Sequence, residues 1–357
     1  MSKPLLSVVI PVYNTGQIAS KLIARVLKQK MDDLELILVD DGSTDDSLAH
    51  LRGWQTKDKR VKVLAQKNGG PSAARNTGLN KARGEYLMFL DSDDDITPGM
   101  IPKMVKRIQK DSADMSVCQL RFNTIKDGRV VSSVDIDKAP IPPQRKDEPK
   151  ETYIVRLLGI DGRLYHPSNK VFRMDIIRKH KLQFREDLRF GEDLTFNLNY
   201  LKHGSNISFV NEPLYIYNFG TGTSVVSKSA LVYKNRQTNF EDLLKFAGDN
   251  RSQELEDLLG WVRHYWFYSF ALAVCDSPLG LREKLSYLSN AIKNEKLTQA
   301  KSPKYIGRNK YLTERLIGLA AKTPATLYVF TAVGNSMKNS RLLAGVWRKL
   351  ATRATKA

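Results

Sequence analysis

The chain has 357 residues, of which 41% are hydrophobic and 27% charged, and its formal net charge is +19. This length and balance indicate a globular protein with a sizeable core and argue against a disulfide-rich or disordered chain. Its two cysteines, Cys118 and Cys275, lack paired spacing, so we expect reduced thiols and a cytoplasmic location. We expect no signal peptide, because a strand-like segment follows Pro4 directly. Residues 317–334, the best candidate for a membrane span, are interrupted by Lys322 and Pro324.

The first hundred residues alternate between strand-like and helix-like patterns. We expect strands at residues 5–10, 34–39, 61–65 and 85–90, and helices at residues 17–29, 45–51 and 71–82. This order predicts a mainly parallel sheet with helices on both faces, in which sites lie at the carboxyl ends of the strands. Polar residues follow three of these strands, at positions 13–14, 40–41 and 91–95, so we expect them to meet at one edge.

The polar residues after the expected strand at 85–90 form an acidic cluster of Asp91, Asp93, Asp94 and Asp95. Carboxylates gathered at the end of a core strand repel one another. A hard divalent cation, bound through oxygen ligands and shared with substrate phosphates, would compensate for this repulsion. Because Asp is also common in turns, the cluster alone supports a metal site and a solvated turn about equally.

The remainder of the chain gives less specific signals. Residues 137–151 are rich in proline and charge and read as an exposed connector, and residues 171–180 have a helix-like pattern. From about residue 239 we expect helices, with the aromatic face of residues 254–275 in the core.

The last 57 residues are strongly basic. They contain twelve Lys or Arg residues and one acid, Glu314, which points to an anionic partner. The helical spacing of residues 343–354 places Trp347 on an apolar side. This pattern fits a helix lying on an anionic membrane surface, and it fits equally well a helix docked on the protein.

Four motifs of the first hundred residues resemble those of family 2 glycosyltransferases. They lie at residues 7–14, 39–45, 68–78 and 84–94, in the order and spacing of that family. The resemblance implies a GT-A (Rossmann-like) α/β fold, with a mainly parallel sheet flanked by helices. It also implies a nucleotide-sugar donor and inversion at the anomeric carbon.

The resemblance assigns donor-binding roles to several residues. Pro11 and Tyr13 would pack near the nucleobase, Asp41 would accept a hydrogen bond from the uracil imide nitrogen, and Arg75 would reach the base or the diphosphate. Each also has a structural explanation: Tyr13 as a core aromatic at a strand end, Asp41 as a turn residue, and Arg75 as a solvated helix residue. Only their shared spacing favours the functional roles.

The resemblance also implies a metal site. Asp93 would ligate a divalent ion on the diphosphate, while Asp91 would contact the ribose or bind the metal through water. Oxygen ligands suit Mg or Mn rather than zinc, and such an ion would neutralise charge on the leaving nucleoside diphosphate. An EF-hand is excluded, because Ile96 and Pro102 stand where Gly and Glu are required.

An inverting transfer further needs a carboxylate that takes the proton of the attacking hydroxyl. Residues 188–196 resemble the family's acidic pair at the start of a helix, so we predict Asp193 as the base and Glu192 as its neighbour, with exchangeable roles. Acidic residues also favour helix N-termini for electrostatic reasons, which explains the pair without catalysis. Lys170 is a weaker candidate for binding a phosphate, and His166 is expected to be an ordinary loop residue.

We therefore expect three regions: a nucleotide-sugar-binding half of the GT-A domain at 1–122, an acceptor-binding half at 123–238, and a helical basic C-terminal region at 239–357. By analogy with the family, a loop at 220–224 would close over the donor.

The predicted function is transfer of a sugar from a UDP-sugar to a hydroxyl of a saccharide or lipid-linked saccharide acceptor. We expect the reaction to depend on Mn or Mg and to serve cell-surface polysaccharide or lipo-oligosaccharide synthesis. The enzyme would be cytoplasmic or peripheral on the inner face of the cell membrane. A sugar-nucleotide nucleotidyltransferase and a basic nucleic-acid-binding protein are the alternatives. A nucleotidyltransferase normally has a Gly-rich phosphate loop after strand one, and residues 12–16 match such a loop poorly. A nucleic-acid-binding protein would have a recognition motif, and the sequence has none that we recognise, so no nucleic-acid partner is expected.

Overall fold

The structure, a computed structural model, describes residues 3–135, 141–160, 163–188, 190–220, 229–277 and 279–294. Within these ranges the chain forms two compact units. The first unit comprises the described residues up to Lys150 and those from 163 to 220. The second unit comprises residues 151–160 and the helices from Ser229 onward. The division of the catalytic domain into halves at residue 122 stays a prediction.

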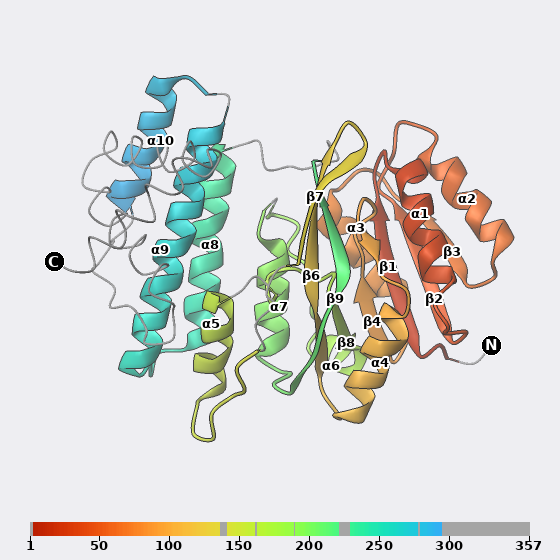
Figure 1. The fold of residues 1–357 in the computed structure, drawn as a ribbon, viewed down its shortest axis with the longest axis horizontal. Helices are drawn as coiled ribbons and strands as arrows, with labels where there is room; N and C mark the ends of the chain where they lie inside the picture. The colour runs from red at the N-terminus through yellow and green to blue at the C-terminus, as the bar shows by residue number, and fades with distance from the viewer. Residues whose placement is uncertain are drawn as a thin grey trace. The chain divides into compact units, whose positions relative to one another are not determined.

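A sheet of nine strands, counted over the described residues, forms the centre of the first unit (Figure 1). The strands are β1 (Leu6–Val12), β2 (Leu34–Asp40), β3 (Val61–Ala65), β4 (Tyr86–Phe89), β5 (Asp95–Ile96), β6 (Met115–Lys126), β7 (Arg129–Asp135), β8 (Lys170–Arg173) and β9 (Ile207–Phe219). Their order across the sheet is β3-β2-β1-β4-β8-β6-β9-β5, and β7 pairs with the second half of β6.

The strand directions bring several carboxyl ends to one edge. Strands β3, β2, β1 and β4 are mutually parallel, as the sequence predicted. Strand β8 is antiparallel to both β4 and β6, so β4 and β6 point the same way, and β9 is parallel to β6. The second half of the sheet is therefore mixed. Sites following β1, β2, β4, β6 and β9 share one edge, which we call the catalytic edge.

Six helices of the first unit pack around this sheet in the described residues. They are α1 (Gly16–Leu27), α2 (Ser47–Lys57), α3 (Pro71–Lys81), α4 (Met100–Lys110), α6 (Met174–Lys179) and α7 (Glu192–Leu201). Alternation along β1 divides the helices between faces: Val8 and Ile10 belong to the core built with α1 and α4, whereas Val9 meets α3. A Cβ at Gly78 of α3 would lie only 2.3 Å from Val9 Cγ1, so glycine lets this helix lie directly on the sheet.

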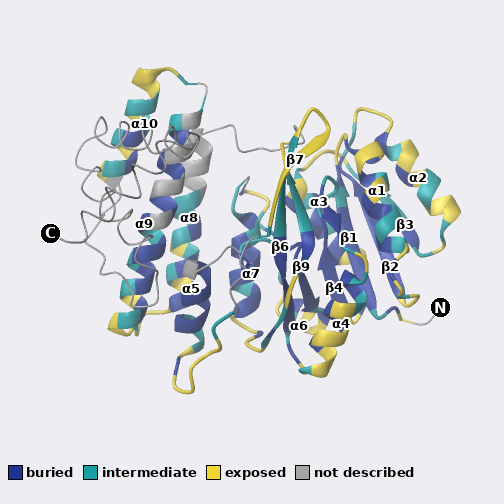
Figure 2. Ribbon diagram, in the orientation of Figure 1, coloured by how far each residue is buried: buried dark blue, intermediate teal, exposed yellow. Residues whose placement is uncertain are grey.

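Burial explains which strands the sequence revealed. Every residue of β2 is buried, as expected for a parallel strand covered on both faces, whereas six of the seven residues of β7 are exposed (Figure 2). The prediction of a helix at residues 171–180 was wrong in its first part. Residues 170–173 form β8, because they pair with β4 and β6 in the interior, and only Met174–Lys179 is helical.

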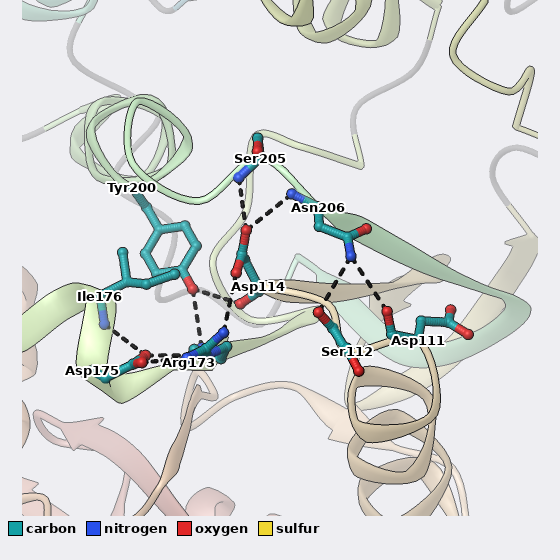
Figure 3. A network of polar contacts seen from close by, with 9 residues as sticks. All are labelled: Asp111, Ser112, Asp114, Arg173, Asp175, Ile176, Tyr200, Ser205 and Asn206. Atoms are coloured by element: carbon teal, nitrogen blue, oxygen red, sulfur yellow. Dashed lines mark hydrogen bonds and ion pairs between the residues drawn. The ribbon is translucent and has the colours of Figure 1, made fainter. Parts of the chain in front are cut away.

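A polar network at the opposite edge of the sheet fixes one end of α7 (Figure 3). The Tyr200 hydroxyl near the end of α7 donates to the Asp114 carbonyl at 2.5 Å and accepts from the Arg173 backbone N–H at 3.1 Å. The Asp114 carboxylate accepts from the backbone N–H groups of Ser205 and Asn206 at 2.9 and 3.0 Å. Because α7 is about 15 Å long, anchoring its end here places its first turn at the catalytic edge.

The second unit consists of helices in its described residues: α5 (Lys150–Ile160), α8 (Ser229–Ala247), α9 (Gln253–Asp276) and α10 (Leu281–Asn294). As the sequence predicted, α9 buries aromatic side chains, including Trp261 and Phe270. Among the helices that the structure describes, none has the length and hydrophobicity needed to cross a bilayer. Of the loop predicted at 220–224, the structure describes Gly220, whereas residues 221–224 and the basic helix predicted at 343–354 lie outside the described residues.

Candidate active site

The three polar segments predicted to meet at one edge of the sheet are joined there by hydrogen bonds. After β1, the Asn14 backbone N–H donates to the Ser43 hydroxyl at 3.0 Å, and the Asn14 side-chain oxygen accepts from the Thr44 N–H at 2.8 Å. The Thr15 hydroxyl lies 2.8 Å from the Ser92 hydroxyl, which joins the segment after β1 to the acidic cluster after β4. Asn14 has a φ of 52°, a left-handed conformation that Asn tolerates better than most residues.

Arg75, in α3, lies at the centre of a group of carboxylates. Its Nη2 lies 2.7 Å from Asp91 Oδ1, and its Nη1 lies 3.0 Å from Asp193 Oδ1 and 3.4 Å from Glu192 Oε1. We call these four residues the Arg75 cluster. It joins the metal motif predicted after β4 to the acidic pair predicted at the start of α7.

Exposure differs sharply within the Arg75 cluster. The Arg75 side chain is 5% exposed, whereas those of Asp91 and Asp193 are 24% and 25% exposed. The guanidinium therefore lies beneath carboxylates that reach the surface. Its carbon lies 5.3 Å from the centre of the Phe184 ring, a distance suited to a cation–π contact.

The segment that carries Phe184 is held against α3 by Asn76. The Asn76 amide donates to the Phe184 carbonyl at 2.9 Å and accepts from the Phe184 N–H at 2.8 Å. Phe184 stacks on Phe196 of α7, with ring centres 4.1 Å apart and planes at 4°, and meets Phe89 of β4 edge-on at 5.0 Å. These rings form a rigid floor under the Arg75 cluster.

Negative charge exceeds positive charge in the Arg75 cluster, since three carboxylates share one guanidinium. Burial raises the pKa of Asp193 to about 8; Glu192 and Asp91 add to this rise, and Arg75 opposes it. Burial would also raise the pKa of Asp91, but Arg75 and the Ser168 hydroxyl, which donates to Asp91 Oδ2 at 2.7 Å, hold this pKa below its ordinary value. Asp193 and Asp91 therefore differ in basicity because of their partners: the pKa of Asp193 is raised and that of Asp91 is lowered.

The acidic cluster after β4 divides into residues with different partners. Asp95 forms ion pairs with Arg25 and Lys21 at 2.7 and 2.9 Å, and therefore fastens β5 to α1. Asp94 is buried and accepts hydrogen bonds from the Tyr215 hydroxyl and the Asn218 N–H. Burial raises the pKa of Asp94 well above its ordinary value, with Asp91 and Asp93 contributing.

Asp93 is partly exposed between these residues. The Asn218 amide donates to its backbone carbonyl at 2.9 Å, so β9 fixes the main chain that carries the Asp93 side chain. Among the described residues, no group of three or more His, Cys, Asp or Glu side chains could hold a metal by itself. Asp93, with Asp91 close by in sequence, fits instead an ion held by one or two carboxylates together with substrate phosphates, as Mg²⁺ commonly is. The surplus of negative charge is consistent with such an ion.

Asp41 anchors the loop that leads into α3. Its buried carboxylate accepts from the backbone N–H groups of Gly69 and Gly70 at 2.9 and 2.8 Å and from Gln66 Nε2 at 2.7 Å. These contacts hold the Asp41 carboxylate at the catalytic edge, and the next residue, Gly42, has a left-handed φ of 72°. Contact between Asp41 and a nucleobase stays a prediction.

The remaining predicted residues lie in contrasting environments. Tyr13 is 47% exposed beyond the end of β1, so the alternative of a core aromatic was wrong, and Pro11 lies within β1 beside Val39. Lys170 is fully buried, and its ammonium donates to Asn169 Oδ1 and to the Arg163 carbonyl at 2.8 and 2.5 Å. In these contacts Lys170 fastens the loop before β8, and its role in binding a phosphate stays a prediction.

Several residues of the site were not singled out from the sequence. Ser168 and Asn218 hold Asp91 and Asp93, and Phe184 supports Arg75. Ser168 lies between His166 and Lys170, two residues considered in the sequence analysis. The segment that contains Ser168 was therefore already a candidate part of the site. Phe184 and Asn218 have no distinctive local pattern, because their roles depend on pairing with distant segments.

Comparison with known proteins places this chain among sugar-transferring enzymes. The family profile described as Glycosyl transferase family 2 matches residues 7–181. The uncharacterized glycosyltransferase EpsJ of Bacillus subtilis is 30% identical over 60% of this chain and 61% of its own length. The putative glycosyltransferase EpsH of the same organism is 31% identical over 71% of this chain and 72% of its own length.

Solved structures support the same fold. The structure of residues 1–349 of Staphylococcus aureus TarS in complex with UDP-GlcNAc superposes with a TM-score of 0.62. The match covers 94% of this chain and 91% of that one at 19% sequence identity. The similarity therefore shows a common GT-A fold, a sheet flanked by helices.

Proposed function

This chain belongs to glycosyl transferase family 2, and from that premise we propose that it transfers a sugar from a UDP-sugar to a saccharide hydroxyl with inversion. The observation that carries the proposal is the Arg75 cluster, which brings the residues predicted for the donor and the acceptor together at one edge of the sheet. The preference for UDP is supported by the UDP-GlcNAc complex of TarS, which shares the fold.

In the proposed reaction, the acceptor hydroxyl attacks the anomeric carbon from the face opposite the nucleotide. Asp193 takes the hydroxyl proton as the new C–O bond forms and the bond to the UDP oxygen breaks. Once ionised, a carboxylate with a raised pKa is a stronger base than an ordinary Asp, which suits this role as the pH approaches the Asp193 pKa of about 8. Glu192, in the same first turn of α7, would contact the acceptor or orient Asp193.

Donor binding would use the residues around this pair. A Mn or Mg ion bound when the donor is present would stabilise negative charge on the departing diphosphate. Asp93 would hold this ion, with Asp91 as a second or water-mediated ligand. Tyr13, exposed beyond β1, would offer its ring to the nucleobase near Pro11.

We further propose that the acceptor is a growing surface polysaccharide or its lipid-linked precursor. A curated relative, the poly(ribitol-phosphate) beta-glucosyltransferase of Bacillus spizizenii, is 28% identical over 59% of this chain and 32% of its own length, and it supports a polymer acceptor. The basic segment 301–357 would keep the enzyme at an anionic membrane, at about 1 kcal/mol for each basic residue near the surface. Truncation after Gly334 should then reduce binding to anionic liposomes, and unchanged binding would contradict this role.

The direct test measures heat stability and products with a panel of UDP-sugars and Mn, Mg or EDTA. We expect one UDP-sugar to raise the melting temperature in the presence of metal and to yield free UDP when an acceptor is added. Release of pyrophosphate from UTP and a sugar phosphate would indicate a nucleotidyltransferase instead. Stabilisation by DNA but by no nucleotide sugar would indicate a nucleic-acid-binding protein.

A further inference from the structure

The position of Arg75 suggests a role different from the donor contact that the sequence predicts. Its guanidinium is covered by the carboxylates that it binds: 5% of the Arg75 side chain is exposed, against 24% of Asp91 and 25% of Asp193. A ligand entering from solvent therefore meets the carboxylates before it meets Arg75.

The guanidinium connects residues from different parts of the fold. Its Nη2 pairs with Asp91, which follows β4, and its Nη1 pairs with Asp193, which lies in the first turn of α7. Because the two nitrogens belong to one rigid planar group, the distance between these carboxylates is fixed by Arg75. A lysine ammonium cannot reproduce this bridge, since it has a single nitrogen on a flexible chain.

The surroundings hold the guanidinium itself in place. Phe184 lies against it at 5.3 Å, and Phe184 is stacked on Phe196 of α7. Asn76, the next residue in α3, binds both the N–H and the carbonyl of Phe184. Helix α3, the Phe184 segment and α7 therefore support one fixed orientation of Arg75.

We propose that Arg75 is a positioning residue that holds the base Asp193 at a set distance from Asp91, and so couples donor binding to placement of the base. This inference rests on the proposed function, in which Asp91 serves the donor and Asp193 the acceptor. When a donor binds to Asp91, the contact between Asp91 and Arg75 changes. Because the same guanidinium also binds Asp193, the position of Asp193 changes with it.

The test compares full-length Arg75→Gln and Arg75→Lys with the wild type and with Arg60→Gln as a matched control. Arg60 also binds a carboxylate, Asp58, at 2.8 Å and donates to the Leu27 carbonyl, but it lies before β3, at the edge opposite the catalytic edge. The readouts are kcat at saturating donor, the Kd for UDP with Mn, and hydrogen exchange of residues 192–198.

For Arg75→Gln we expect kcat to fall by about 100-fold, because misplacing a catalytic group by about 1 Å costs this much. The Kd for UDP should change by less than about threefold, since the direct donor contacts remain. Residues 192–198 should exchange faster than in wild type, and UDP with Mn should protect them only in wild type and Arg60→Gln. Arg75→Lys should keep the fold and show the same pattern with a smaller loss of kcat; it decides the question if Arg75→Gln does not fold.

Three results would overturn the proposal. A Kd for UDP weakened tenfold or more, with kcat preserved, would show that Arg75 contacts the donor directly. If a folded Arg75 variant had the kcat and the hydrogen exchange of the wild type, Arg75 would not be needed to position Asp193. Faster exchange throughout the first unit would show a purely structural role. If wild type releases no UDP from any UDP-sugar, the proposed function fails, and the exchange comparison still decides whether Arg75 positions the first turn of α7.

Discussion

Replacing Asp193 by Asn removes an ionisable group from the Arg75 cluster with little change in shape. The folded protein keeps a proton on Asp193 up to about pH 8, because burial, Glu192 and Asp91 together raise its pKa against the opposing effect of Arg75. The unfolded chain releases the same proton near the ordinary value of 3.8. Between these values the folded state binds more protons than the unfolded state, so Asp193 makes stability fall as the pH rises.

The size of the effect follows from this difference in proton binding. One proton bound by the folded state alone lowers stability by at most about 1.4 kcal/mol per pH unit. From pH 5.5 to 7.5 the upper limit is therefore about 2.7 kcal/mol. Because 25% of the Asp193 side chain is exposed to screening solvent, we expect about 2 kcal/mol. Asp193→Asn lacks this proton, so its stability relative to wild type should rise by that amount over the interval.

Urea unfolding of both proteins in EDTA, at pH 5.5 and 7.5, measures this difference. Asp187→Asn is the matched control, because its Arg185 partner lowers the pKa of Asp187 and the group is ionised at both pH values. The control should therefore show no pH-dependent change relative to wild type. Parallel pH dependence of wild type and Asp193→Asn would refute the reasoning, since it would show that Arg75 already keeps Asp193 ionised. The same variant should retain UDP binding and lose transfer.

Three further substitutions test other parts of the site and the fold. Asp93→Ala should abolish Mn-dependent binding of UDP in calorimetry, and unchanged affinity would rule out its role as a ligand. Asp41→Asn should destabilise the protein by about 2 kcal/mol, because the new amide cannot accept from both Gly69 and Gly70, and an unchanged urea midpoint would contradict this. Gly78→Ala should cost about 1–3 kcal/mol through the clash with Val9, whereas Gly53→Ala, with nothing within 4 Å, should be neutral or stabilising; equal melting temperatures would disprove the close packing of α3.

Local patterns were sufficient for the first half of the fold. The strand predicted at residues 61–65 agrees with β3, and the helix predicted from Pro71 begins at that residue. These elements are legible because parallel strands buried on both faces are continuously apolar and because proline favours the first turn of a helix. Strands β6, β7 and β9 were not predicted. Exposed residues such as Val131 of β7 do not form a continuous apolar run, and the pairing of β6 with β9 joins segments far apart in the sequence.

The sequence by itself determined the order of strands and helices in the first hundred residues, the family, and the residue types available for chemistry. These follow from short-range periodicity and motif spacing, which are properties of neighbouring residues. Only the tertiary structure decided that Asp94 is buried against Tyr215 and that Arg75 lies under Asp91 and Asp193. The burial and partners of a charged side chain depend on segments more than a hundred residues away, so the same Asp or Arg in the sequence is compatible with several roles until the chain has folded.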